Sequence, residues 1–229
     1  MRVAPDWLGL RYDRERRGAG HVESWFVKAS EPSGRRAIWV KCTVFASPPL
    51  PPVAESWAIA FDRHRGHVAV KSTVALADAR FAADALDLVV DGCAMSLDLA
   101  RGSLASGRGA VSWDLELGPP LAAPIVHLPL AAMYSARLPP AAKLVTPLAD
   151  ARARGAVRVE RAEGDVDAWE VDAWPVTVGH NWGARHPELY AWTHCNAFSL
   201  DGLVFEAISA RVRVGPLLSP MATSAYLRW

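Results

Sequence analysis

Apolar and polar residues alternate along most of this chain, and a two-residue period is typical of β-strands. The clearest case is the segment 37–45. In an extended chain its Ile38 and Val40 lie on one face, whereas Trp39 and Lys41 lie on the other. An aromatic ring and a lysine on the same face favour a sheet that lines a partly solvated cavity.

Turn-forming residues divide this pattern into short strands. An alanine-rich segment, 76–86, is where we expect a short helix, and Gly102 is expected in a turn. Asp201-Gly202 predicts a tight turn that joins 198–200 to 203–214 as a hairpin. Short strands, tight turns and no β-α-β rhythm predict an all-β antiparallel fold of the barrel or sandwich kind. The expected strands before residue 198 are 24–29, 37–45, 55–62, 67–74, 88–90, 95–99, 110–117, 156–159 and 169–174.

A segment rich in proline, alanine and leucine, 118–147, interrupts the strand pattern. It is expected to be an ordered apolar connector that packs on the sheet. It therefore predicts the boundary between two β units, an N-terminal unit at 1–147 and a C-terminal unit at 148–229.

Length and charge restrict the functional classes. The chain has 229 residues, of which 51% are hydrophobic and 21% charged, with a net charge of +1. This balance is ordinary for a globular protein with a substantial core and argues against binding of nucleic acid. Cys42, Cys93 and Cys195 form no CxxC pair, the N-terminus lacks the apolar core of a signal peptide, and no apolar run is long enough for a membrane span. These features predict a cytoplasmic protein without disulfides.

The stretch 179–198 is the candidate for chemistry. It contains three histidines, two tryptophans, a tyrosine, an arginine, a glutamate and two asparagines. Apolar walls with a few placed polar groups are typical of a ligand pocket. His180, His186 and His194 could ligate a metal together with Glu188 or Cys195, but the spacings between the histidines fit no zinc signature. We expect no metal and no cofactor.

The sequence resembles the lipocalin-like family that includes carotenoid hydratases (hydroxyneurosporene synthase) and, more distantly, tocopherol cyclase and the cyclases and Diels–Alderases of natural-product biosynthesis. The residues that carry the resemblance are Ser24-Trp25-Phe26-Val27-Lys28-Ala29, Ala37-Ile38-Trp39-Val40-Lys41, Ser112-Trp113-Asp114, Gly179-His180-Asn181-Trp182-Gly183, 190–192, 195–198 and 205–211.

This resemblance implies two successive β-barrel or sandwich units with an apolar pocket in and between them. It also implies that His180 and Trp182 match a His-x-Trp element near a reacting alkene, and that Glu206 matches an acidic proton donor on a later strand. Family members continue beyond the position of Trp229. The second barrel is therefore expected to be either reduced or completed by another chain in a homo-oligomer.

Each candidate also has a structural interpretation. His180 and Trp182 point the same way in a strand, where an imidazole can transfer protons and an indole face can stabilise a carbocation; alternatively they form a glycine-flanked turn. Glu206, if it points inward, would have its pKa raised and act as an acid; if it points outward, it is solvated. Arg185 would bind a carboxylate or enolate oxygen, or pair with Glu188.

We expect the catalytic residues to be His180 and Glu206. Trp25, Trp39, Lys41 and Trp113 have ordinary barrel packing as their alternative. The residues expected to bind the substrate are Trp25, Trp39, Lys41, Trp113, Trp182, Arg185, Tyr190, Trp192, His194 and Asn196.

The resulting hypothesis is a cofactor-independent isomerase, cyclase or hydratase that acts on an apolar polyene, terpenoid or polyketide. The alternative is a lipocalin-like carrier of a hydrophobic small molecule, and a third is an interaction module without a ligand. No Ser-His-Asp order along the chain, P-loop or dinucleotide fingerprint is present. Hydrolase, kinase and dehydrogenase functions are therefore not expected.

Overall fold

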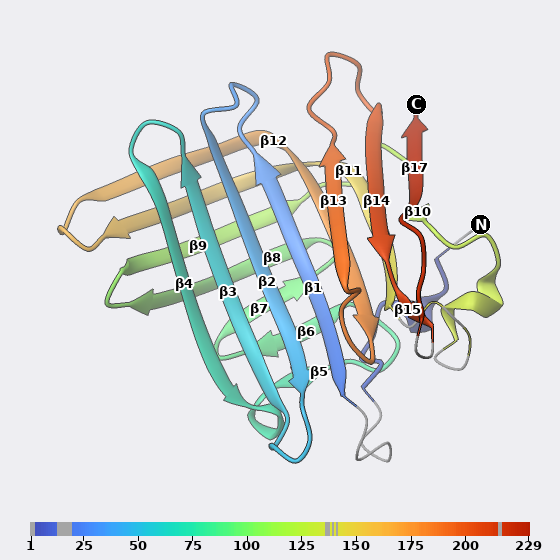
Figure 1. Cartoon of the computed structure of the whole chain (residues 1–229). Helices are drawn as coiled ribbons and strands as arrows, with labels where there is room; N and C mark the ends of the chain where they lie inside the picture. Colours follow the sequence, from blue (N-terminus) through green and yellow to red (C-terminus); the bar gives the residue numbers. More distant parts are fainter. Residues whose placement is uncertain (1–2, 13–19, 136–137, 139, 141, 215–216) are drawn as a thin grey trace.

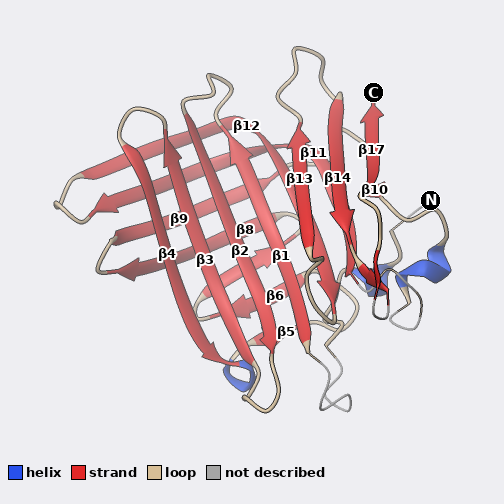
Figure 2. Ribbon diagram, viewed as in Figure 1, coloured by secondary structure: helices blue, strands red, loops and turns tan. Residues whose placement is uncertain are grey.

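β-Strands make up nearly all of the molecule (Figures 1 and 2). The computed structural model describes residues 3–12, 20–135, 138, 140, 142–214 and 217–229. Its helical turns are η1 (Pro5–Trp7), η2 (Leu76–Asp78) and η3 (Ala131–Tyr134). Its strands are β1 (His21–Ser30), β2 (Arg36–Ala46), β3 (Val53–Asp62), β4 (Gly66–Ala75), β5 (Arg80–Phe81), β6 (Asp87–Val90), β7 (Cys93–Ser96), β8 (Leu99–Ser106), β9 (Gly109–Leu117), β10 (Ile125–Val126), β11 (Ala142–Arg161), β12 (Val166–Gly183), β13 (Leu189–Cys195), β14 (Val204–Arg211), β15 (Arg213–Val214), β16 (Leu217–Leu218) and β17 (Ala222–Arg228).

Twelve of these strands form one large antiparallel sheet. Its order is β4-β3-β2-β1-β12-β11-β9-β8-β7-β6-β5, and β10 pairs with β11. The sheet curls on itself, so that β1–β4 cross over β5–β9 (Figure 1), and β4 packs against β8 and β9. Within the described part of the chain, no helix has both the length and the apolar character that a membrane crossing requires.

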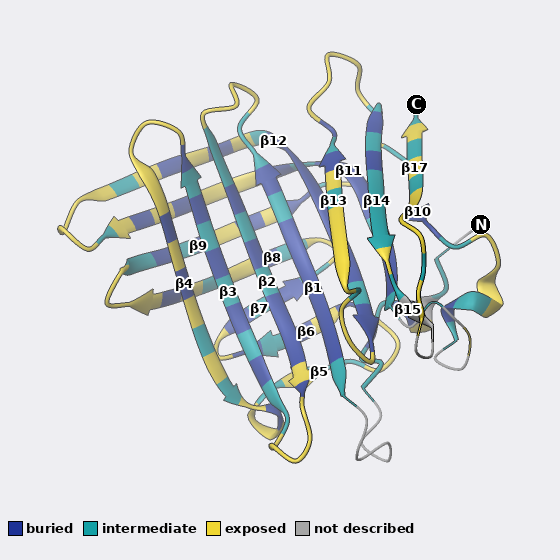
Figure 3. Cartoon of the chain, in the orientation of Figure 1, coloured by how far each residue is buried: buried dark blue, intermediate teal, exposed yellow. Residues whose placement is uncertain are grey.

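The main core fills the inside of this curled sheet. Ile38 and Val40 of β2 face inward, as the alternation predicted, and pack in one cluster with Val70, Val90 and Leu115. Burial alternates residue by residue along β3, and Figure 3 shows the same alternation on the neighbouring strands. The predicted antiparallel all-β fold is confirmed.

Two long strands, β11 and β12, connect the curled sheet to the rest of the molecule. The first half of β12 pairs with β11 alone, and its second half, from Val176 to Gly183, also pairs with β1. β11 carries a bulge at Gly155, whose φ is +136° and where a Cβ would lie 2.0 Å from the backbone oxygen of Asp114. The division of the chain at residue 147 stays a prediction, and β11 runs across that position.

A smaller sheet, β13-β14-β17, lies beside the outer face of β1 and β12 (Figure 1). Its strand β14 pairs with β13 on one side and with β17 on the other. The predicted hairpin around Asp201-Gly202 is wrong in its first arm, because residues 198–200 form no strand. The turn itself is present, and Gly202 adopts a φ of +77°.

Two further local predictions are wrong. The alanine-rich segment 76–86 forms only a short 3-10 turn and the strand β5, and Leu76 anchors it in the core. Gly102 lies within β8 rather than in a turn. A Cβ at Gly102 would lie 2.5 Å from the ring of Trp113, so this glycine provides the space that the indole fills.

Candidate functional site

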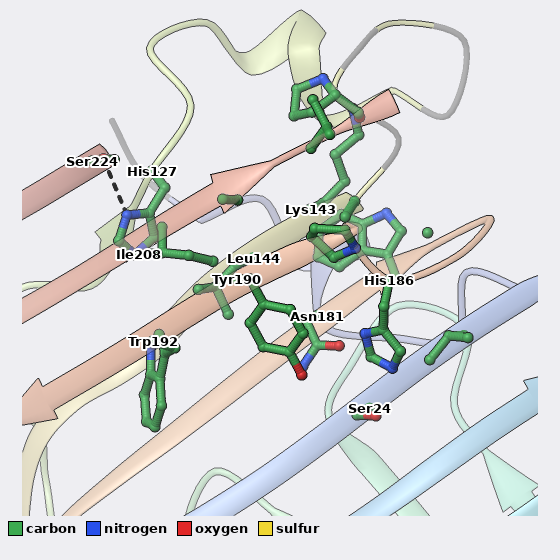
Figure 4. Close-up of a pocket in the computed structure, with 18 of the residues that line it drawn as sticks. Ser24, His127, Lys143, Leu144, Asn181, His186, Tyr190, Trp192, Ile208 and Ser224 are labelled. Carbon is green, nitrogen blue, oxygen red and sulfur yellow. Dashed lines mark hydrogen bonds between the residues drawn. The ribbon is translucent and has the colours of Figure 1, made fainter. Parts of the chain in front are cut away.

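A cavity of about 450 Å³ lies between the outer face of the large sheet and the inner face of the small sheet. This volume falls in the range of small-molecule pockets, roughly 300–1,000 Å³. Figure 4 shows side chains from both sheets converging on it. The residues that line it are Val22, Ser24, Phe26, Trp39, Lys41, His127, Leu128, Pro140, Ala142, Lys143, Leu144, Asn181, Trp182, Gly183, Arg185, His186, Pro187, Tyr190, Trp192, Ile208, Ala210, Val212, Ser219, Ala222, Thr223 and Ser224.

Aromatic side chains from three strands form one wall of the cavity. The ring of Phe26 meets Trp192 edge-on at 5.3 Å between centroids and Trp39 at 5.9 Å. Phe26 lies opposite Gly179 in the β1–β12 pairing, and a Cβ at Gly179 would lie 2.1 Å from the Phe26 ring. The first glycine of the His/Trp-rich stretch therefore makes room for this wall.

The ionisable groups of the cavity are basic. Lys143 is buried, and its Nζ donates to the carbonyl oxygens of Leu138 at 2.7 Å and of Pro140. Burial lowers the pKa of Lys143 and is also the main cause that lowers the pKa of Lys41. Arg185 is exposed at the rim. No Asp or Glu is found among the described residues that line the cavity, so the interior favours an anionic or electron-rich ligand end.

Glu206 lies fully buried just behind the cavity wall. Its Oε1 accepts hydrogen bonds from Thr146 at 2.8 Å, His127 at 3.0 Å and Trp192 at 3.1 Å. Burial alone would raise the pKa of Glu206, but the hydrogen bonds from His127 and Trp192 outweigh it and lower the pKa. Glu206 thus points inward. The predicted rise of its pKa is wrong, because the sequence does not show which residues donate hydrogen bonds to this carboxylate.

His180 lies on the opposite side of β12 from the cavity. It is fully buried and stacks between Trp25, at 4.5 Å between ring centroids, and Trp182, at 4.7 Å. Its Nδ1 lies 2.6 Å from the carbonyl oxygen of Trp7, and its Nε2 lies 3.0 Å from Oε1 of Glu23. His180 and Trp182 share a face, as predicted from the strand period, but only Trp182 reaches the cavity.

Glu23 is the centre of this second buried network. Its carboxylate accepts from the backbone N–H of Arg11 at 2.8 Å and faces Nε2 of His21 at 2.8 Å as well as Nε2 of His180. Burial opposes ionisation, yet the hydrogen bonds with His180 and His21 lower the pKa of Glu23. An ionised carboxylate and a backbone carbonyl can only accept, so both ring nitrogens of His180 face acceptors, which suits a doubly protonated imidazole.

Two other predicted residues join the small sheet to the large one. His194 Nε2 donates to the carbonyl oxygen of Ala149 at 3.0 Å, and Asn196 Nδ2 donates to Asp150 and to the carbonyl oxygen of Val176, each at 3.0 Å. Burial is the main cause that lowers the pKa of His194, to about 4. These side chains hold β13 and the segment after it against β11 and β12.

The predicted residues thus divide into two groups. Trp39, Lys41, Trp182, Arg185, Tyr190 and Trp192 line the cavity. Trp25, Trp113, His180, His194, Asn196 and Glu206 lie outside its lining. Among the residues that the structure describes, no three His, Cys, Asp or Glu side chains are grouped as metal ligands would be.

The sequence analysis did not find several lining residues. His127 follows β10 in the proline-rich segment, where no periodic pattern marks it, and Ser224 lies on β17, which was not predicted. Lys143, Asn181 and His186 also line the cavity. The sequence did contain a signal for Asn181, because the strand period places this residue on the face of β12 opposite to His180 and Trp182.

No family model matches the sequence. An uncharacterized protein of Mycobacterium tuberculosis strain H37Rv is 28% identical over 218 residues, which are 94% of this chain and 60% of that protein. A protein of strain CDC 1551 matches with the same values. The chain therefore spans 60% of the length of the curated relatives that it matches.

Solved structures share the fold. A crystal structure of a candidate AttH from Nitrosomonas europaea superposes with a TM-score of 0.53 at 17% identity, over 93% of this chain and 68% of that one. CghA, crystallised with Sch210972, superposes with a TM-score of 0.55 at 12% identity, over 91% of this chain and 58% of that one. These likenesses confirm the predicted lipocalin-like fold.

Proposed function

We propose that the chain binds a small molecule with an apolar body and an anionic or carbonyl-rich end, and that it catalyses a cofactor-independent cyclisation or isomerisation of this molecule. The observation that carries the proposal is the cavity of about 450 Å³, which has aromatic walls and basic groups but no described carboxylate in its lining. A polyene, terpenoid or polyketide with a carboxylate or enolate fits this chemistry.

The cavity would act mainly by holding its substrate in a reactive conformation. Phe26, Trp39 and Trp192 restrict a flexible apolar chain, and such restriction removes part of the entropic barrier of a cyclisation. Lys143 and Arg185 would hold the polar end and stabilise negative charge that develops on it. The fold is shared with CghA, which was crystallised with Sch210972, and this supports the binding of a small molecule by such a fold.

Hydration of an alkene, the other reaction implied by the family resemblance, requires a proton donor at the substrate. Glu206 would supply such a proton only through His127, which does line the cavity. His180 would act indirectly, by fixing the indole of Trp182 through their ring contact. Cyclisation or isomerisation guided by binding needs neither step and is therefore the preferred function.

A carrier without catalysis is the second candidate. The observation that favours it is that neither His180 nor Glu206, the two expected catalytic groups, belongs to the cavity lining. A carrier needs only the apolar walls and the basic groups. It would release its ligand chemically unchanged.

The test is incubation of the protein with an extract of apolar metabolites, followed by mass spectrometry of both the retained and the released compounds. We expect a retained compound and a product of identical mass with a different retention time. Arg185→Met should weaken retention, whereas Arg154→Met, at an exposed position on β11, should not. Retention of a compound without any conversion would contradict the proposed cyclisation or isomerisation. If no compound is retained, the proposed ligand binding itself is contradicted.

A further inference from the structure

A serine, a histidine and a glutamate lie in line at one end of the cavity. Ser224 Oγ lies 3.2 Å from Nδ1 of His127, and Nε2 of His127 lies 3.0 Å from Oε1 of Glu206. Ser224 and His127 both line the cavity, and Figure 4 shows their hydrogen bond. The three residues come from β17, from the segment after β10 and from β14, in the chain order His, Glu, Ser.

The hydrogen-bonding partners fix the direction of each proton. Glu206 Oε1 also accepts from Thr146 and Trp192, which suits an ionised carboxylate that can only accept. His127 therefore carries its proton on Nε2 and leaves a free electron pair on Nδ1. Ser224 can donate its hydroxyl proton to that pair. The ring nitrogens have exchanged places relative to the usual Ser-His-acid order, but the roles are the same.

Glu206 is also suited to a change of charge on the histidine. Its side chain is fully buried, and its second oxygen, Oε2, has no hydrogen-bond partner among the described residues. An incompletely compensated carboxylate in an apolar site stabilises a cation next to it. Protonation of His127 at Nδ1 would create such a cation, 3.0 Å from Glu206.

We propose that Ser224, His127 and Glu206 form a nucleophilic triad that cleaves esters with an apolar acyl group bound in the cavity. Ser224 Oγ would attack the acyl carbonyl carbon while its proton passes to Nδ1 of His127. The bond from the carbonyl carbon to the alcohol oxygen breaks, and the alcohol leaves with that proton. Water then attacks the acyl-serine, gives its proton to His127, and the carboxylic acid is released as Ser224 regains a proton.

Another cavity group suits this reaction. Lys143 lines the same cavity and is available as a donor to the developing oxyanion, whereas the hydroxyl of Thr223 is bonded to that of Ser209. Lys143 has three donors, of which the carbonyl oxygens of Leu138 and Pro140 take two. The ester cleavage shares the cavity with the proposed function but does not depend on cyclisation or isomerisation.

The test uses a fluorophosphonate probe and p-nitrophenyl esters from acetate to octanoate. Peptide mapping of the labelled wild-type protein should place one adduct on Ser224, without the need for a variant. Ester cleavage should rise about fourfold with each added methylene until the cavity is filled. Ser224→Ala should abolish both reactions. Ser209→Ala, on the opposite face of β14, is the matched control and should change neither.

Glu206 acts as a positioning residue, so its variant is judged by more than loss of rate. Glu206→Gln should lower kcat about 10³-fold and leave KM unchanged, because the wrong tautomer of His127 is then favoured. A purely structural role would change KM and would also weaken the binding of retinoic acid, an apolar acid whose binding is followed by quenching of tryptophan fluorescence. A labelled residue other than Ser224, no labelling, or full ester cleavage by Ser224→Ala overturns the triad. Retinoic acid binding, which Ser224→Ala should retain, tests the proposed ligand site separately.

Discussion

Removal of the Glu23 carboxylate should destabilise the protein more than any surface change. Glu23 is fully buried and faces three groups, the N–H of Arg11 and the imidazoles of His21 and His180. Glu23→Ala leaves all three without their acceptor in the interior. Breaking a buried ion pair from one side costs about 3–5 kcal/mol, which is the expected loss here.

The isosteric variant separates charge from shape. Glu23→Gln keeps an oxygen for the N–H of Arg11 and an amide that can donate to a neutral His180. It should therefore cost less, about 1–3 kcal/mol. For a chain of this size, 1 kcal/mol corresponds to roughly 2–4 °C in Tm, so Glu23→Ala should lower Tm by about 6–20 °C. Glu116→Ala, an exposed carboxylate on β9, is the control and should stay within about 0.5 kcal/mol of wild type.

The assay is urea unfolding of the wild type and the variants between pH 7 and pH 4. Folding lowers the pKa of Glu23 below its ordinary value of 4.5. The carboxylate therefore stabilises the folded state fully above that pH and loses its contribution as the pH falls toward the lower folded-state pKa. The stability gap between wild type and Glu23→Gln should narrow below pH 4.5. A loss under about 1 kcal/mol for Glu23→Ala at pH 7 would refute this role of the network.

Three further predictions concern the cavity wall and single ionisable groups. Gly179→Ala should push the Phe26 ring into the cavity, since the added Cβ would lie 2.1 Å from it; urea unfolding should show a loss of about 1–3 kcal/mol, and tryptophan quenching should show weaker ligand binding. Burial raises the pKa of Cys42 to about 12, so a thiol reagent at pH 8 should modify the partly exposed Cys195 and reach Cys42 only after unfolding; equal rates would contradict this. Burial and a neighbouring lysine lower the pKa of His194 to about 4, so its NMR imidazole signals should stay those of the neutral ring from pH 7 to about pH 5.

The strand period predicted the framework well but not the short elements. Ile38 and Val40 face the core because a strand that buries one face must alternate, and the sequence records that alternation directly. The segment 76–86 is different. Its alanines favour a helix, yet Leu76 is buried in the core and the chain then pairs as β5, so tertiary packing overrides local preference.

The candidate functional site shows more clearly what the sequence pattern cannot predict. Alternation placed His180 and Trp182 on one face, but it could not show that Trp182 and Asn181 line the cavity while His180 does not. The partners of Glu206 were also beyond reach, because His127 is 79 residues away in a segment without a periodic pattern. The direction of a carboxyl's pKa shift depends on the groups around it. Groups 79 residues apart in the sequence are brought together only by the tertiary fold.

The central claim is that the cavity binds an apolar molecule by its body and an anionic end by its basic groups. Retinoic acid and retinol share one polyene body and differ in that end, so quenching of tryptophan fluorescence by each tests the claim directly. We predict that wild type binds retinoic acid about tenfold more tightly than retinol, and that Lys143→Met removes this preference while it retains retinol binding. Equal affinities in wild type, or no quenching by either compound, would contradict the claim.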